Sequence, residues 1–302
     1  MTVDGTVTGE TVTKEPEQGS TVVLTIDSKL QEVAETALKN NIEKIKNGGF
    51  SNRYDAKGGS VAVIDVHSGE ILAMASYPDY NPNSWVGGIS VAEYNQIKEN
   101  NALFNKAVSG SYAPGSIFKM VTALAGLETG AISVGEKIND TGIYTRYKDY
   151  QPRCWYYNSY HRGHGYLNVS GAIQHSCNYF FYETGNRMGI ENLDKYAEYF
   201  GLGKKTGIEL PSETAGTLAS PEAAKKLNET WSAGQTLQAS IGQSYNSFSP
   251  LQLVKYIGMV ANGGNKIKPT LIKRILNADG TESSKTEINE YVKQKLGLED
   301  DN

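Results

Sequence analysis

The sequence has 302 residues, of which 39% are hydrophobic, so it can bury a full core as one large domain or two smaller ones. The formal net charge is -4, which gives no sign of nucleic-acid binding or of a basic membrane-surface patch. No stretch is apolar for long enough to cross a membrane, and the polar start at Met1 lacks the features of a signal peptide. The two cysteines are too few for a disulfide scaffold.

The first part of the chain predicts a linker followed by a mixed domain. Residues 1–20 are interpreted as a linker or the remnant of an N-terminal pedestal domain, and residues 21–302 as the main domain. The β-branched run 21–26 predicts a strand. Apolar residues at helical spacing from Leu30 to Ile45 predict a helix that ends at Gly48-Gly49, with Ser28 and Gln31 as its capping box. Segments 60–65 and 71–76 predict two strands joined by a tight turn.

The rest of the chain is mainly helical by its pattern. An apolar helix follows Ser116 and stops at Gly130, and residues 130–166 are irregular and aromatic. Three further helices are expected over 169–182, 192–200 and 251–261, the first interrupted near residues 176–178. Residues 269–276 predict a strand, and the tail from 277 to 302 is charged and polar.

The stretch Tyr112-Ala-Pro-Gly-Ser-Ile-Phe-Lys-Met120 carries a candidate nucleophile. Pro114 and Gly115 suit a helix entry, so Ser116 lies in the first turn, where unpaired N–H groups favour a developing negative charge. Lys119 follows three residues later and rises on the same face. A lysine can take a serine proton only if its pKa is lowered, and the apolar surroundings favour this. A bare S-x-x-K pattern also fits a capping serine and a solvent-facing lysine, but companion motifs favour catalysis.

Several such stretches together resemble the penicillin-binding proteins, the serine D,D-transpeptidases that cross-link peptidoglycan, and more narrowly their class B (monofunctional) branch. The matching stretches are residues 24–27, 30–31, 59–65, 69–74, 112–119, 176–178, 200–203, 240–243 and 249–252. The resemblance implies an α+β fold of the penicillin-binding and β-lactamase type, with a mainly antiparallel sheet flanked by helices on both sides.

The resemblance also implies a role for each motif residue. Ser116 is the acylated nucleophile and Lys119 the acylation base. Ser176 relays the proton to the leaving D-alanine, and Asn178 binds the substrate backbone and Lys119. The backbone N–H of Ser116 supplies half of an oxyanion hole. No cofactor is needed for this chemistry.

A third family motif, K-T-G or K-S-G on a strand, does not stand where the family has it. Lys205-Thr206-Gly207 spells it, but in a glycine-rich turn, and Lys285-Thr286-Glu287 lacks the glycine. We therefore expect that the domain is incomplete at its C-terminal end and lacks a complete active site as written.

The aromatic region also suggests a metal site. Cys154, His164 and Cys177 with Asp149 as fourth ligand, or His161 in its place, would satisfy tetrahedral zinc. Such a zinc would brace the fold beside the catalytic loop. The alternatives are a disulfide or two buried free cysteines, and histidines that only hydrogen-bond.

Two other functions share the serine motif. A β-lactamase would need a deacylating base, and residues 191–194 match an E-x-x-L-N loop only superficially. A β-lactam sensor or peptidoglycan-binding module would be acylated without turnover. The bifunctional branch of the family is a further alternative. The family reading implies stem peptides, β-lactams and other cell-wall proteins as partners, no nucleic acid, and a place outside the bacterial cell membrane, anchored by a segment preceding this chain.

Overall fold

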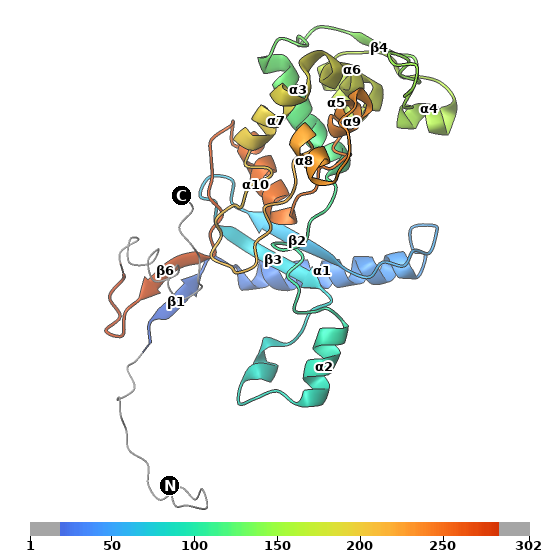
Figure 1. Ribbon diagram of the computed structural model, residues 1–302. Coiled ribbons are helices and arrows are strands. Elements are labelled where there is room, and N and C mark those ends of the chain that lie inside the picture. The colour runs from blue at the N-terminus through green and yellow to red at the C-terminus, as the bar shows by residue number, and fades with distance from the viewer. Residues whose placement is uncertain (1–18, 284–302) are drawn as a thin grey trace, which may run out of the picture. The chain divides into compact units, whose positions relative to one another are not determined.

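The computed structural model describes residues 19–283, which form two compact units (Figure 1). The larger unit comprises residues 26–271. The smaller unit takes the described parts of both ends of the chain, and its strands β1 (Thr21–Leu24) and β6 (Ile272–Leu276) pair antiparallel. Most of the predicted linker, residues 1–18, and the tail from 284, which includes Lys285, lie outside the described residues.

A two-stranded antiparallel sheet organises one side of the larger unit. Strands β2 (Gly59–Ile64) and β3 (Ile71–Tyr77) pair with Gly59 opposite Tyr77 and a register shift next to Ile64. Helix α1 (Ser28–Lys46) packs on one face through an apolar cluster that includes Leu30, Ala34 and Leu38. Helix α10 (Pro250–Ala261) approaches the other face, where Gly258 lies against Ile64.

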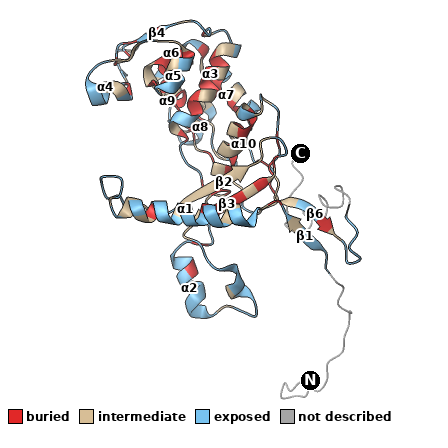
Figure 2. Ribbon diagram, turned by 180° about the vertical axis from the view of Figure 1, so that it is seen from behind, coloured by how far each residue is buried: buried red, intermediate tan, exposed pale blue. Residues whose placement is uncertain are grey.

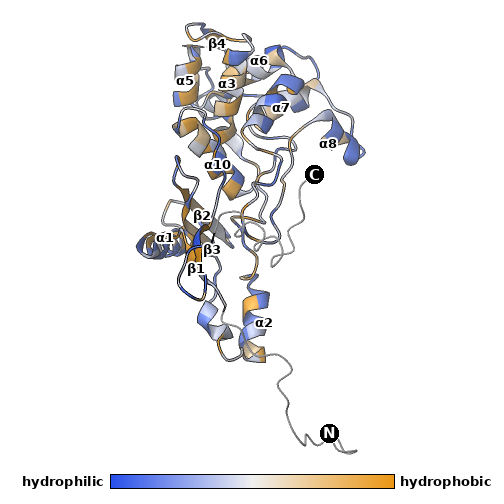
Figure 3. Ribbon diagram, turned by 90° about the vertical axis from the view of Figure 1, so that its left-hand side faces the viewer, coloured by the Kyte–Doolittle hydropathy of each residue, from blue (hydrophilic) through white to orange (hydrophobic). Residues whose placement is uncertain are grey.

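The remaining elements of this unit are mainly helices and include a second small antiparallel sheet. The elements are η1 (Pro82–Trp85), α2 (Val91–Glu99), η2 (Gly115–Phe118), α3 (Lys119–Glu128), β4 (Ile138–Asp140), α4 (Trp155–Tyr160), β5 (Gly165–Leu167), α5 (Val169–Gln174), α6 (Asn178–Met188), α7 (Ile190–Tyr199), α8 (Pro221–Lys226) and α9 (Ala233–Ala239). Strand β4 pairs with β5. Figure 3 shows apolar residues along α10 and polar ones along α8.

Helix α3 lies between the two largest apolar clusters of the structure. Val121 and Ala125 belong to a cluster shared with α7 and α10, and Ala123 to one shared with α6 and α9. Figure 2 shows how much of α3 is buried. Hydrogen bonds hold α3 and the turn η2 that leads into it: Thr122 Oγ1 in α3 donates to Ser240 O at 2.7 Å, and Tyr256 Oη donates to Ile117 O in η2 at 2.5 Å. A helix held from two sides in this way is a rigid support for any group at its N-terminus.

The structure confirms the predicted α+β class with antiparallel pairing and helices on both faces of β2–β3. The helices expected over 169–182, 192–200 and 251–261 are α5 with α6, α7 and α10, and the first is interrupted at residues 175–177 as predicted. The interpretation of 130–166 as irregular was wrong, because β4 and α4 form there and β5 begins. The capping box was also wrong: Asp27 caps α1, and Gln31 bonds the backbone of Met74 instead.

We predict that Gly242→Ala destabilises the protein more than Gly130→Ala does. Both glycines have positive φ, +75° and +72°, so each alanine costs about 1–2 kcal/mol of left-handed backbone strain. A Cβ at Gly242 would also lie 2.2 Å from Gly115 O, whereas no atom lies within 4 Å of one at Gly130. The close contact should lower the free energy of unfolding by a further 1–3 kcal/mol, roughly, in urea titrations. Equal losses for the two variants would show that this close approach contributes nothing.

Candidate active site

Ser116 and Lys119 share one face because the chain enters α3 through the tighter turn η2. Side chains at positions i and i+3 eclipse in a 3₁₀ helix, and Gly115–Phe118 is such a turn. Gly115 has a φ of +57°, and its N–H donates to Gly242 O at 2.9 Å, which fixes the turn in place. Ser116 therefore faces a cleft, while Lys119 directly below it is only 2% exposed.

Ser176 and Asn178 come from the sharp turn between α5 and α6. Ser176 has a φ of 50°, in the left-handed region that non-glycine residues rarely adopt. Cys177 is the N-cap of α6, and its Sγ accepts from Phe180 N at 3.4 Å. Alternate side chains consequently point to opposite sides: Ser176 and Asn178 toward Lys119, and Cys177 toward Asp140. Such a strained residue, held by its surroundings, is typical of a functional site.

The structure brings the four predicted catalytic residues together in one hydrogen-bonded chain. Ser176 Oγ donates to Ser116 Oγ at 2.9 Å. Lys119 Nζ donates to Ser176 O at 2.7 Å, to Ser176 Oγ at 3.0 Å and to Asn178 Oδ1 at 2.6 Å. Ser176 Oγ thus lies between the hydroxyl of Ser116 and the amine of Lys119. This order provides a short path along which a proton can leave Ser116.

Burial prepares Lys119 to accept a proton. It lowers the pKa of Lys119 from its ordinary value near 10.5 to about 8, against the opposing pull of Cys154 and Cys177. An amine with a pKa of about 8 is partly neutral near physiological pH, whereas an exposed lysine is almost fully charged. The sequence-based expectation of a depressed pKa therefore has a physical basis in the structure.

The cleft in front of Ser116 encloses about 480 Å³. It is lined by Gly115, Ser116, Trp155, Ser176, Asn178, Tyr182, Gln238, Ile241 and Gln243. Trp155 and Tyr182 were not predicted, although Ile241 and Gln243 lie in a stretch that the motif comparison had singled out. Trp155 Nε1 donates to His175 O at 3.1 Å and to Ser176 O at 3.0 Å, so the indole holds the catalytic turn.

A cluster of potential metal ligands lies directly behind the catalytic turn. The ligand atoms of Asp140, Cys154, His164 and Cys177 all lie within 4.8 Å of one another. His164 Nδ1 is 2.7 Å from Asp140 Oδ2, and Cys177 Sγ is 3.3 Å from the same oxygen. The prediction of Cys154, His164 and Cys177 as one group is consistent with this arrangement.

The carboxylate predicted for the cluster was wrong. Asp149 is exposed and lines a different cavity, and His161 ends α4 at the surface. Asp140 takes the place because β4 pairs with β5 in a register that sets Asp140 opposite Gly165, the neighbour of His164. That pairing is a long-range feature, which the spacing of residues along the chain does not reveal.

Hydrogen bonds control the ionisation of this buried cluster. Although burial opposes it, bonds from His164, Gly142 and Cys177 hold the pKa of the Asp140 carboxyl below its usual range. Hydrogen bonding between the two sulfurs lowers the pKa of Cys154, and together with burial it raises the pKa of Cys177. His164 Nε2 is buried and lacks a hydrogen-bond partner within the described part of the chain.

The donor set fits a zinc ion by its chemistry. Two sulfurs, an imidazole and a carboxylate are ligands that zinc accepts, and their mutual separation suits a single ion after small adjustments. Because Cys177 stands between Ser176 and Asn178, any ligand of its sulfur would also restrain the catalytic turn.

The misplaced third motif remains outside the site. Residues 205–207 lie in no strand, and the N–H and hydroxyl of Thr206 both donate to Glu213 at 2.6 Å. The bonds of Thr206 and Gly207 to Glu213 therefore stabilise this local segment, which agrees with the interpretation that it is not the strand motif.

Comparison with known proteins decides the family. The profile described as "Penicillin binding protein transpeptidase domain" matches residues 59–298. The chain belongs to the penicillin-binding protein transpeptidase family. It is 34% identical over 264 residues to the peptidoglycan D,D-transpeptidase MrdA of Acinetobacter baumannii, covering 86% of this chain and 36% of that relative. The chain thus spans little more than a third of the length of this curated relative.

Solved structures show the same family fold. The crystal structure of Pseudomonas aeruginosa PBP2 in complex with WCK 5153 matches with a TM-score of 0.74 and 34% identity, covering 88% of this chain and 56% of that one. PBP2 of Helicobacter pylori in its complex with MreC matches with a TM-score of 0.73 and 31% identity, covering 91% of this chain and 47% of that one. Within residues 19–283, no helix is both long and apolar enough to span a membrane.

We predict that Lys119 of this transpeptidase domain titrates near pH 8. Its side chain should be protonated below that pH and neutral above it, because burial penalises the charged form. NMR of lysine labelled at the ε carbon would follow the titration, with Lys119→Arg identifying the signal by its loss. Titration near 10.5, the ordinary lysine value, would contradict the buried environment described here.

Proposed function

We propose that this chain catalyses D,D-transpeptidation of peptidoglycan stem peptides through an acyl-enzyme on Ser116. The observation that carries the proposal is the hydrogen-bonded chain from Ser116 Oγ through Ser176 Oγ to Lys119 Nζ. A hydroxyl nucleophile linked to a partly neutral amine is the arrangement that nucleophilic acyl transfer requires. The name of the Acinetobacter relative, peptidoglycan D,D-transpeptidase, supports the substrate class.

In the acylation step, Ser116 Oγ attacks the carbonyl carbon of the penultimate D-alanine. With Lys119 neutral, the two hydroxyls turn so that Ser116 Oγ donates to Ser176 Oγ and Ser176 Oγ donates to Lys119 Nζ, and the Ser116 proton passes along these contacts to the amine. The carbon–nitrogen bond then breaks, and a proton returned through Ser176 neutralises the departing amine of D-alanine. Asn178, whose side chain already accepts from Lys119, would hold the peptide backbone.

In the transfer step, the amine of a second stem peptide attacks the acyl carbon. A new amide bond forms, the bond to Ser116 Oγ breaks, and the proton lost by the amine ends on Ser116. The N–H of Ser116, in the first turn of η2, would stabilise the oxyanion in both steps. β-Lactams would acylate the same serine, because their strained amide resembles the D-Ala-D-Ala terminus.

The proposed substrate also implies where the protein works and with which proteins it assembles. Peptidoglycan lies outside the cytoplasm, so we propose that the domain works at the extracytoplasmic face of the bacterial membrane. The solved complex of Helicobacter pylori PBP2 with MreC supports cell-wall synthesis proteins as partners. These proposals concern the whole protein, because the curated relative is much longer than this chain.

We predict that labelled penicillin adds its mass to the protein and that Ser116→Ala abolishes the gain. Ser111→Ala is the matched control: this nearby exposed serine bonds Ser247 and should leave labelling intact. Denaturing mass spectrometry measures both, on this chain and on the full product of its gene where that is longer. No labelling of either form would contradict the acyl-enzyme. Rapid loss of the label as hydrolysed penicillin would indicate a β-lactamase, and labelling without peptide transfer a sensor.

We also propose that Asp140, Cys154, His164 and Cys177 hold one structural zinc. The donor set and its compactness support this, and the ion would restrain the turn that carries Ser176 and Asn178. The zinc would supply coordination alone, because the proton path does not pass through these residues.

We predict that native mass spectrometry finds about 63 Da of additional mass, the increment for one zinc replacing two protons. Asp140→Asn should lose this mass and lower the melting temperature, because it removes a ligand. Asp149→Asn is the matched control and should keep both, since Asp149 is exposed and outside the cluster. Loss of zinc from both variants, or no zinc uptake by the parent protein, would contradict the assignment.

A further inference from the structure

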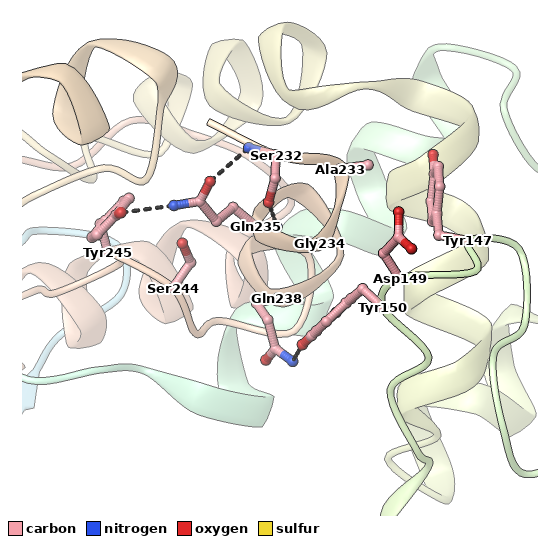
Figure 4. Close-up of a pocket in the computed structure, with 10 residues that line it drawn as sticks. All are labelled: Tyr147, Asp149, Tyr150, Ser232, Ala233, Gly234, Gln235, Gln238, Ser244 and Tyr245. Carbon is pink, nitrogen blue, oxygen red and sulfur yellow. Dashed lines mark hydrogen bonds between the residues drawn. The ribbon is translucent and has the colours of Figure 1, made fainter. Parts of the chain in front are cut away.

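A second cavity adjoins the active-site cleft. It encloses about 640 Å³, and Figure 4 shows the ten residues that line it. Tyr147, Asp149 and Tyr150 come from the segment after β4, and the facing wall is the first turn of α9 with Ser244 and Tyr245. Gln238 lines both this cavity and the cleft of Ser116. A molecule in the cavity could therefore continue into the cleft.

Close packing joins the segment after β4 to α9 along one edge of the cavity. The Tyr150 hydroxyl accepts a hydrogen bond from Gln238 Nε2, which ties the segment to α9. The Tyr150 ring lies over Gly234, where an added Cβ would be 2.9 Å from Cδ1. Only glycine at position 234 leaves room for the ring in this place. On the far side, Gln235 bonds Ser232 N and Tyr245 Oη, so that wall is also held.

The charged lining of the cavity is negative. No lysine or arginine is among its lining residues, and Asp149 is its single carboxylate. Asp149 has no hydrogen-bond or ion-pair partner within residues 19–283, and Figure 4 shows its carboxylate beside the Tyr147 ring. A second carboxylate, Glu229, bonds Tyr245 Oη at the edge. A carboxylate with tyrosine rings favours an ammonium group on an aliphatic stem.

We propose that this cavity binds the acceptor peptide of the transfer step, through the ammonium group that the peptide carries before reaction. The inference rests on the proposed function, which requires a second peptide with a free amine to approach Ser116. Asp149 attracts the ammonium, the tyrosines contact the aliphatic stem, and Gln238 lines the way into the cleft. The ammonium gives one proton to solvent before the neutral amine attacks the acyl carbon.

The test measures binding of two probe peptides by isothermal calorimetry. One is an N-acetylated tetrapeptide with a single lysine, and the other carries an acetyl group on that lysine. The parent protein should bind the free amine about tenfold more tightly, the discrimination expected of one charge-assisted hydrogen bond. Asp149→Asn should reduce this preference to below about twofold. Glu99→Gln, the same change of charge at an exposed site in α2, should keep it.

A second variant fills the cavity without changing its charge. Ala233 is exposed at the start of α9, so Ala233→Leu should fold normally and weaken binding of both peptides. Unchanged binding to Ala233→Leu would overturn the proposal, as would an equal preference in the parent and Asp149→Asn, or no preference in the parent.

Penicillin labelling of the parent protein in the same samples tests the transpeptidase assignment separately from the acceptor site. Labelling without amine preference would overturn the acceptor site alone. Absence of labelling would overturn the transpeptidase assignment, while an amine preference abolished by Asp149→Asn would still establish a cavity selective for ammonium-bearing peptides.

Discussion

The buried amine of Lys119 is the constraint on which the active site depends. Taking an amine out of water is costly unless its hydrogens find acceptors, and the turn at Ser176 and Asn178 supplies them. The same contacts fix the Ser176 hydroxyl beside Ser116. The hydrogen bonds that satisfy the buried Lys119 amine therefore also position the residues of the proton path. Burial itself lowers the pKa of Lys119.

Rigid surroundings hold this arrangement from both sides. In front, η2 and the left-handed turn at Gly115 present Ser116 to the cleft. Behind, Trp155 holds the Ser176 carbonyl, and Cys177 faces the buried cluster with Asp140. Catalytic geometry has to be kept within a fraction of an ångström, and side chains locked by packing and hydrogen bonds can do so. The strain at Ser176 is one cost of this arrangement.

Spacing along the chain predicted what is local. Ser116 with Lys119, and Ser176 with Asn178, are separated by three and two residues, so one turn decides which side chains share a side. What depends on distant pairing was missed. Asp140 lies in the cysteine cluster because of the register in which β4 pairs with β5. The cavity at Asp149 forms between the segment after β4 and helix α9, which are far apart in sequence. The periodicity of the sequence does not predict these long-range contacts.

The most direct test of the account is the rate at which penicillin acylates Ser116 as a function of pH. Lys119 is the base only when neutral, so the rate should rise with pH to a plateau, with its midpoint at about 8. Ser176→Ala interrupts the path and should slow acylation on the order of 100-fold. A rate independent of pH between about 6 and 9, or full activity in Ser176→Ala, would contradict the proton path from Ser116 to Lys119.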